Sequence, residues 1–278
     1  MEVVETGNRN EVHYKFETLS EYLEIAKKGY EMGIHTSRPS DFNANVSFNG
    51  AMEFAKTGWS EGIDKVVTGM SGMVDKLSDI NGEDLVPNLC GGAPNYEAVI
   101  AGTPDRFLDF EEVEEHRPVL KLGVQFSAQG QYSTQCFTNR GSAMLSLMEV
   151  LEMGGIPVEL WGYSNTIYDG NPPKIQRMDI KLKASDEPID TDRIAFVLAH
   201  GGFYRQIGFM VKNYFARTKS NGVNEYNTPD NCRSFELADD AFDVLTPYSP
   251  NFLRSKADIR KWIFETCEEL GVDVEFNH

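Results

Sequence analysis

Apolar residues alternate with others in the stretch Leu120-Lys121-Leu122-Gly123-Val124-Gln125-Phe126. A period of two is typical of a β-strand with one buried face. A helix that begins at Asn139 is predicted next, because apolar residues follow at helical spacing and Gly154-Gly155 ends the pattern. Ile156–Leu160 then alternates again. The segment therefore predicts two neighbouring parallel strands joined by a helical crossover.

The remainder of the second half continues this pattern. Met178–Ala184 alternates and predicts a third strand. The next segment is ambiguous: Ile194–Ala199 reads as a buried strand, or as a helix capped by Asp190, and we favour the helix. Further helices are predicted through Tyr214 and after Ser255, and a short last strand follows Gly271. Residues 119–278 thus predict an α/β domain, a Rossmann-like layered sheet with helices on its faces.

Residues 1–118 are predicted to be a helix-rich acidic region. Thr18 and Glu21 form a capping box at the start of a helix that stops near Gly33. A polar loop over 37–50 and a second helix from Ser60 to Leu77 follow. The acidic run Asp109–Glu115 is typical of a solvated connector and marks the boundary. The sequence leaves open whether this region folds separately or packs on the second half as one domain.

Charge restricts the partners. The 278 residues carry a net charge of −17, and residues 1–118 hold 22 acidic and 10 basic side chains. Phosphate backbones are bound through lysine and arginine, so the composition disfavours a nucleic-acid partner. A basic protein partner, or an acidic region that mimics DNA, stays compatible with it; general solubility is the simpler explanation.

The sequence also indicates a compartment. Its longest apolar runs fall short of the roughly 18 residues that span a bilayer, and Met1–Glu5 lacks the basic start of a secretory signal. The four cysteines are far apart, which argues against a disulfide framework and a thiolate zinc site. We expect a cytoplasmic protein with no membrane partner.

Part of the second half resembles a known domain. Lys121–Gln129, Asn139–Gly141 and the helix up to Trp161 are similar to the first strand, metal loop, helix and second strand of a von Willebrand factor A-type domain. The metal loop of that family reads D-x-S-x-S, whereas this chain has Gln125-Phe126-Ser127-Ala128-Gln129. Because Gln125 replaces the carboxylate that a hard cation needs, the resemblance implies a von Willebrand factor A-like scaffold without its metal.

A wider pattern is similar to a family of uncharacterised bacteriophage proteins and covers roughly residues 55–215. This resemblance implies a phage origin, and with it the host cytoplasm, but no activity. The segments that carry it are Thr57–Gly62, Asn139–Ala143, Leu151–Trp161 and Leu198–Phe209.

Five residues are candidates for binding a ligand or partner. Arg140, with Asn139 in the predicted first turn of a helix, opposes the helix dipole, and such a residue often has a partner. Ser127 lies at the sheet edge where open α/β folds bind ligands. Trp59 is either a packing residue or an anchor for a partner. His200 could activate the thiol of Cys136, although nothing in the sequence brings the two together.

No complete catalytic set is evident, and no cofactor or metal is predicted. The sequence favours a non-enzymatic phage protein that binds another protein or associates with itself through a metal-free scaffold. The alternatives are an enzyme or nucleotide binder that uses the crevice at the carboxyl ends of the strands, and a DNA-mimic inhibitor of host defence. The first alternative rests on analogy between folds, and the second on the acidity of residues 1–118.

Overall fold

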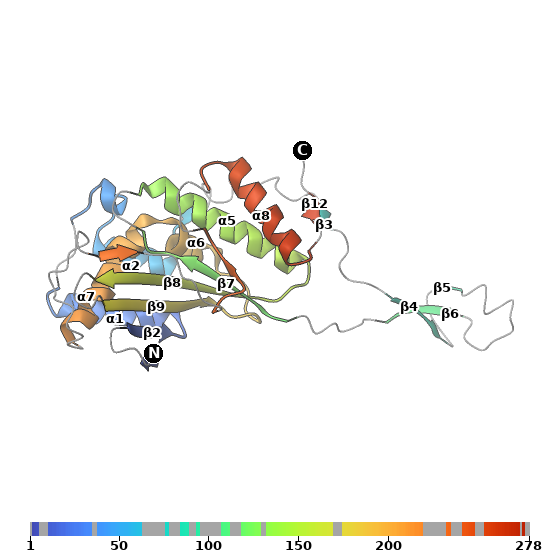
Figure 1. Cartoon of the computed structure of the whole chain (residues 1–278), viewed down its shortest axis with the longest axis horizontal. Coiled ribbons are helices and arrows are strands. Elements are labelled where there is room, and N and C mark those ends of the chain that lie inside the picture. Colours follow the sequence, from blue (N-terminus) through green and yellow to red (C-terminus); the bar gives the residue numbers. More distant parts are fainter. Residues whose placement is uncertain are drawn as a thin grey trace.

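The computed structural model describes, with side chains, residues 11–34, 38–62, 118–128, 132–167, 175–218, 241–247 and 253–272. Several short strands outside these ranges are described by their backbone alone. The molecule is a mixed α/β protein with one main sheet and helices packed against it (Figure 1).

The central unit confirms the predicted crossover. Strands β7 (Leu120–Gln125) and β8 (Val158–Tyr168) are parallel neighbours, with Leu120 opposite Val158. Helix α5 (Thr134–Met153) joins them. Strand β9 (Lys174–Lys183) confirms the third predicted strand and pairs with β8 in the antiparallel sense.

The acidic first part of the chain contributes strands to this sheet. Strand β2 (Glu11–Phe16) lies parallel to β9, and β1 (Glu2–Glu5) pairs with β2. Our description of residues 1–118 as helix-rich missed both strands. On the other side, β11 (Val244–Leu245) pairs with β7, and β10 (Cys232–Ser234) pairs with the end of β8.

One face of the sheet packs on helices through aromatic rings. Tyr14 of β2 stacks on Phe215 at 3.9 Å between ring centroids, and Phe126 meets Phe203 edge-on at 5.4 Å. This layer contains α1 (Leu19–Glu31), α2 (Phe48–Thr57), α6 (Thr191–Ala199), the π-helix η2 (Phe203–Gly208) and α7 (Phe209–Thr218). Helix α8 (Lys256–Glu269) packs on α5 (Figure 1). In the described part of the chain, none of the helices combines the length and apolarity that a bilayer span requires.

The predicted caps of three helices are confirmed. The hydroxyl of Thr18 accepts from the amide of Glu21, and Ser255 forms a full capping box with Asp258. The carboxylate of Asp190 accepts from the amide of Arg193, which settles the ambiguous segment as a helix.

Other boundaries were wrong. Helix α5 begins after Ser133, which has the extended backbone of an N-cap, rather than at Asn139, whose side-chain amide donates to the carbonyl of Leu253. The predicted loop over 37–50 contains the short 3-10 helix η1 (Asp41–Asn43) and the start of helix α2, which runs on to Thr57. Residues 63–75 of the predicted second helix lie outside the described residues, and its end at Leu77 lies in a strand.

The short strands outside the main sheet form two further sheets. Strand β3 (Lys76–Leu77) pairs with β12 (Val274–Glu275), where a last strand was predicted. The first three residues of the predicted connector, 109–111, belong to β6 (Phe107–Glu111), which pairs with β4 (Asp84–Asn88) and β5 (Ala93–Pro94). The rest of the predicted connector, 112–115, lies outside the described residues.

The cap at Asp190 gives a first prediction. Asp190→Ala removes the acceptor of the Arg193 amide and should lower the free energy of unfolding by about 1 kcal/mol, measured by urea denaturation. Asp186→Ala, in the exposed turn before the helix, is the control and should change it by less than about 0.5 kcal/mol. Equal effects of the two variants would contradict the capping role.

Candidate ligand cleft

A cleft of about 580 Å³ lies where three parts of the helical layer meet. Its walls are the loop between η1 and α2, the segment after α2, and the start of α5 facing the end of α6. The lining residues are Ala44, Asn45, Val46, Phe54, Trp59, Glu61, Thr134, Gln135, Thr138, Ala199, His200 and Gly201. The cleft brings together residues from both halves of the chain.

Aromatic side chains form one wall of the cleft. The rings of Trp59 and His200 meet edge-on, with 4.5 Å between centroids, and Phe54 lies 6.2 Å from His200. His200 Nδ1 accepts a hydrogen bond from the amide of Gly202 at 3.0 Å. A neutral His200 therefore carries its proton on Nε2 and is a hydrogen-bond donor there.

The start of α5 supplies a polar wall. Gln135 Nε2 donates to Asn139 Oδ1 at 2.7 Å, and Asn139 Nδ2 donates to the carbonyl of Leu253 at 2.7 Å. This chain of amides fixes the orientation of Gln135. Thr138 Oγ1 donates to the carbonyl of Ala199 at 3.3 Å and ties α5 to the end of α6.

The third wall, the loop between η1 and α2, has an unusual backbone conformation. Ala44 and Asn45 both have positive φ, of 54° and 57°. The left-handed region costs a non-glycine residue roughly 1–2 kcal/mol, so other contacts must stabilise this loop. Gln206 Nε2 donates to the carbonyl of Val46 at 2.8 Å.

Arg205 joins two walls of the cleft. Its guanidinium donates to the carbonyl of Phe42, in η1, and to that of Tyr132 at 2.7 Å, just before α5. Burial lowers the pKa of Arg205 from its usual value. Arg205 and Gln206 both belong to the π-helix η2, an element that often marks functional sites.

The predicted site residues fall into three places. Trp59 and His200 meet in the cleft, and Asn139 orients Gln135 from behind it. Ser127 and Arg140 meet elsewhere, at the end of β7, where Arg140 Nη1 donates to the carbonyls of Gln125 at 2.6 Å and Ser127 at 3.3 Å.

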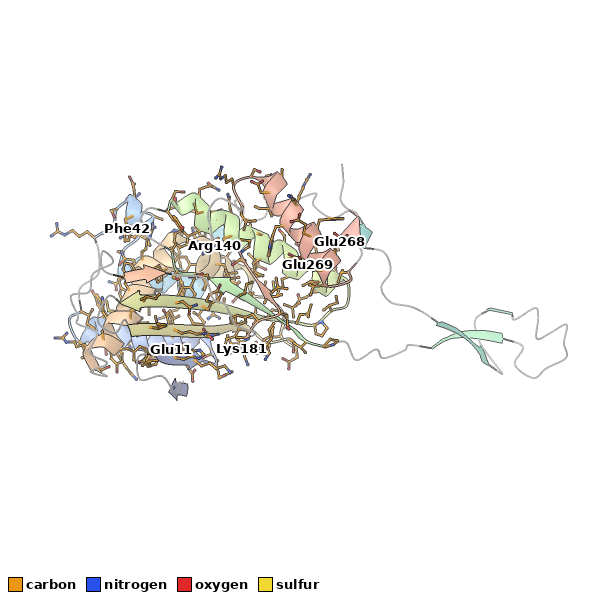
Figure 2. All side chains as sticks on the ribbon, in the orientation of Figure 1. Glu11, Phe42, Arg140, Lys181, Glu268 and Glu269 are labelled. Atoms are coloured by element: carbon orange, nitrogen blue, oxygen red, sulfur yellow. The ribbon has the colours of Figure 1, made fainter. Side chains whose placement is uncertain are left out.

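Arg140 is only 3% exposed and lies between α5 and the sheet (Figure 2). It belongs to the second turn of α5, so the argument from the helix dipole was wrong. Gln125 Nε2 donates to Ser127 Oγ at 3.0 Å. The segment that resembles a metal loop is thus held by an amide and a guanidinium.

Sequence reasoning missed most of the lining. Asn45, Phe54 and Gln135 carry no motif, and only the fold brings them together. One signal was available: Thr138 and Gly141 are small residues one turn apart, which is a spacing that allows close helix packing. Gly141 lies directly against Ala199.

The role of Arg140 gives a second prediction. Arg140→Met keeps an apolar stem of similar length but leaves two buried carbonyls without this donor, so the free energy of unfolding should fall by about 2 kcal/mol in a urea titration. Arg217→Met removes an exposed arginine that also donates to a carbonyl and should cost less than about 0.5 kcal/mol. Equal stability of Arg140→Met and the wild type would contradict the structural role.

Comparison with known proteins places the chain in a family but assigns it no activity. No curated protein and no solved structure matches it. One family model matches residues 3–234, which is most of the chain. The chain therefore belongs to the family described as "Domain of unknown function (DUF7192)".

Proposed function

We propose that this protein binds a small organic ligand in the cleft that Trp59 and His200 line. The observation that carries the proposal is the convergence of three aromatic rings with several polar side chains around one hollow of about 580 Å³. Ligand sites typically measure about 300–1,000 Å³ and combine apolar walls with a few well-placed polar groups.

The way the walls are held also supports binding. Hydrogen bonds hold two of the walls: Asn139 and Thr138 fix the start of α5, and Arg205 and Gln206 fix the segments at Tyr132 and Val46. A site that is organised in advance loses less conformational entropy when its ligand binds. The left-handed residues Ala44 and Asn45 are a further sign, because backbone strain of this kind clusters at ligand sites.

Binding fits the residues better than catalysis does. The Cys136 thiol lies 3.4 Å from the hydroxyl of Ser133, and no hydrogen bond between Cys136 and His200 is found among the described residues. Those residues also contain no group of three or more histidine, cysteine, aspartate or glutamate side chains suited to a metal. The proposal therefore calls on neither an activated thiol nor a metal.

A von Willebrand factor A-like fold, a phage origin and a protein partner are further parts of this proposal. The order β9-β8-β7-β11, with β7 and β8 parallel, is compatible with a von Willebrand factor A-like domain, and sequence resemblance suggests a bacteriophage origin. A protein partner, which the acidity of the chain suggested, could present its own side chain to the same cleft.

A cleft-filling variant tests the function. A fragment library screened by thermal shift should yield compounds that stabilise the wild type, by about 2.7 kcal/mol at 100 times the dissociation constant. Gln135→Phe places a ring at an exposed lining position and should weaken these compounds at least about tenfold, a loss of roughly 1.4 kcal/mol.

Glu149→Phe is the matched control, because Glu149 is exposed on the same helix but does not line the cleft. The control should bind the compounds as the wild type does. The proposed function would be refuted by a screen that finds no stabilising compound, or by compounds that bind Gln135→Phe as tightly as the wild type.

A further inference from the structure

We infer that the ligand of this cleft is a planar cation, an amidinium or guanidinium group on a small molecule. This inference rests on the proposed function and adds the chemical class of the ligand. Three properties of the lining lead to it: the hydrogen-bonding capacity of its amides, its charge, and its aromatic wall.

The side-chain amides of the lining offer acceptors. Asn45 uses its Nδ2 group to donate to Asp41 Oδ1 at 3.1 Å, and Gln135 uses its Nε2 group to donate to Asn139. These bonds fix which end of each amide is the nitrogen. The oxygen of each of these exposed side chains can therefore accept from an N–H donor of a ligand, while each amide nitrogen keeps a second N–H.

The charge of the lining is negative. Glu61 is exposed and lines the cleft, and no lysine or arginine is among the twelve described lining residues. A second carboxylate, that of Asp41, accepts a hydrogen bond from the lining residue Asn45. A carboxylate binds amidinium and guanidinium groups strongly because two parallel N–H donors match its two oxygens.

The start of α5 works against a cation, since a helix N-terminus favours negative charge. This effect is worth a factor of about two to five in affinity. Because Glu61 is exposed, its ion pair with a ligand is worth a factor of up to about five in affinity. The two effects are thus of similar size, and the net charge of −17, which raises the local concentration of cations, favours the cation.

The aromatic wall selects a flat group. Trp59 and Phe54 both line the cleft, and tryptophan is the ring that attracts cations best. Planar cations can stack on a ring while their edge N–H groups reach an acceptor. An ammonium group is not planar, so it cannot stack on a ring and direct edge N–H groups to an acceptor in this way.

An isosteric probe series tests the inference. Benzamidine, benzamide and benzoate share one shape and differ in charge, being cationic, neutral and anionic at pH 7. Isothermal titration of the intact protein in low salt should show benzamidine binding about threefold tighter than benzamide or better, with benzoate weakest.

Glu61→Gln keeps the size of the side chain and should reduce the affinity for benzamidine to about that for benzamide. Glu53→Gln, on the exposed face of α2 and outside the cleft, is the control and should leave the affinity unchanged. A preference for benzamide or benzoate, or an unchanged affinity in Glu61→Gln, would overturn the inference.

The outcome separates this inference from the proposed function. If none of the three probes binds while other fragments bind and respond to Gln135→Phe, the cleft is a ligand site and the planar-cation assignment is wrong. If no fragment responds to Gln135→Phe, the proposed function itself fails.

Discussion

Gly141→Ala is expected to lower the free energy of unfolding by about 1–2 kcal/mol. A Cβ atom at this position would lie 2.7 Å from the Cβ and 2.9 Å from the Cα and amide nitrogen of Ala199, where α5 crosses α6. These atoms belong to a buried backbone that cannot rotate away. Overpacking of this kind costs about 1–3 kcal/mol, and the roughly 1 kcal/mol that alanine gains over glycine in a helix offsets it only in part.

The measurement is a urea titration with Gly201→Ala as the control. A Cβ at Gly201, also helical and buried, would lie 3.5 Å from its nearest neighbour, Phe137, which is an ordinary contact. The control should therefore be close to neutral. Gly141→Ala should also weaken ligands of the cleft, since Ala199 and His200 line it. Wild-type stability of Gly141→Ala would show that the two helices are free to separate.

The sequence predicted those helices and strands in which a regular spacing of apolar residues continues over enough positions to identify the element. The segment from Leu120 to Leu160 has a clear change from period two to period 3.6 and back, and β7, α5 and β8 follow it. Strand β2 also alternates, with Tyr14 and Phe16 buried, but its six residues lie among charged neighbours and were overlooked. Strand β11 has two residues, too few for any period.

The candidate cleft was less accessible to sequence reasoning. Trp59 and His200 were each selected, but nothing in the sequence joins residues so far apart. The structure joins them through α6: the amide of Trp59 donates to the carbonyl of Asp192 at the start of that helix, and His200 ends it. The loop at Ala44 gave no signal either, because alanine is not a residue expected at positive φ.

A buried ion network on the sheet is the second place where a substitution should strongly lower the free energy of unfolding. Asp179 of β9 accepts from Arg177 Nη2 at 2.7 Å and lies 2.8 Å from His13 Nε2 of β2. Burial acts to raise the pKa of Asp179, but the hydrogen bonds from His13 and Arg177 outweigh it and the pKa lies below its usual value. The ionised carboxylate is thus favoured by the fold, and it joins the first part of the chain to the second.

Asp179→Asn is expected to lower the free energy of unfolding at pH 7 by about 3 kcal/mol, because it leaves Arg177 and His13 without this carboxylate. Asp186→Asn, in an exposed turn, is the control and should be neutral within about 0.5 kcal/mol. A lowered pKa in the folded state gives stability that is present above the unfolded value of about 3.9 and is lost as the pH falls through the folded value. The difference between wild type and Asp179→Asn, followed by urea denaturation from pH 7 to pH 3, should therefore shrink below about pH 4. A difference that stays constant to pH 3 would mean that packing at this position, rather than the charge of Asp179, holds β2 to β9.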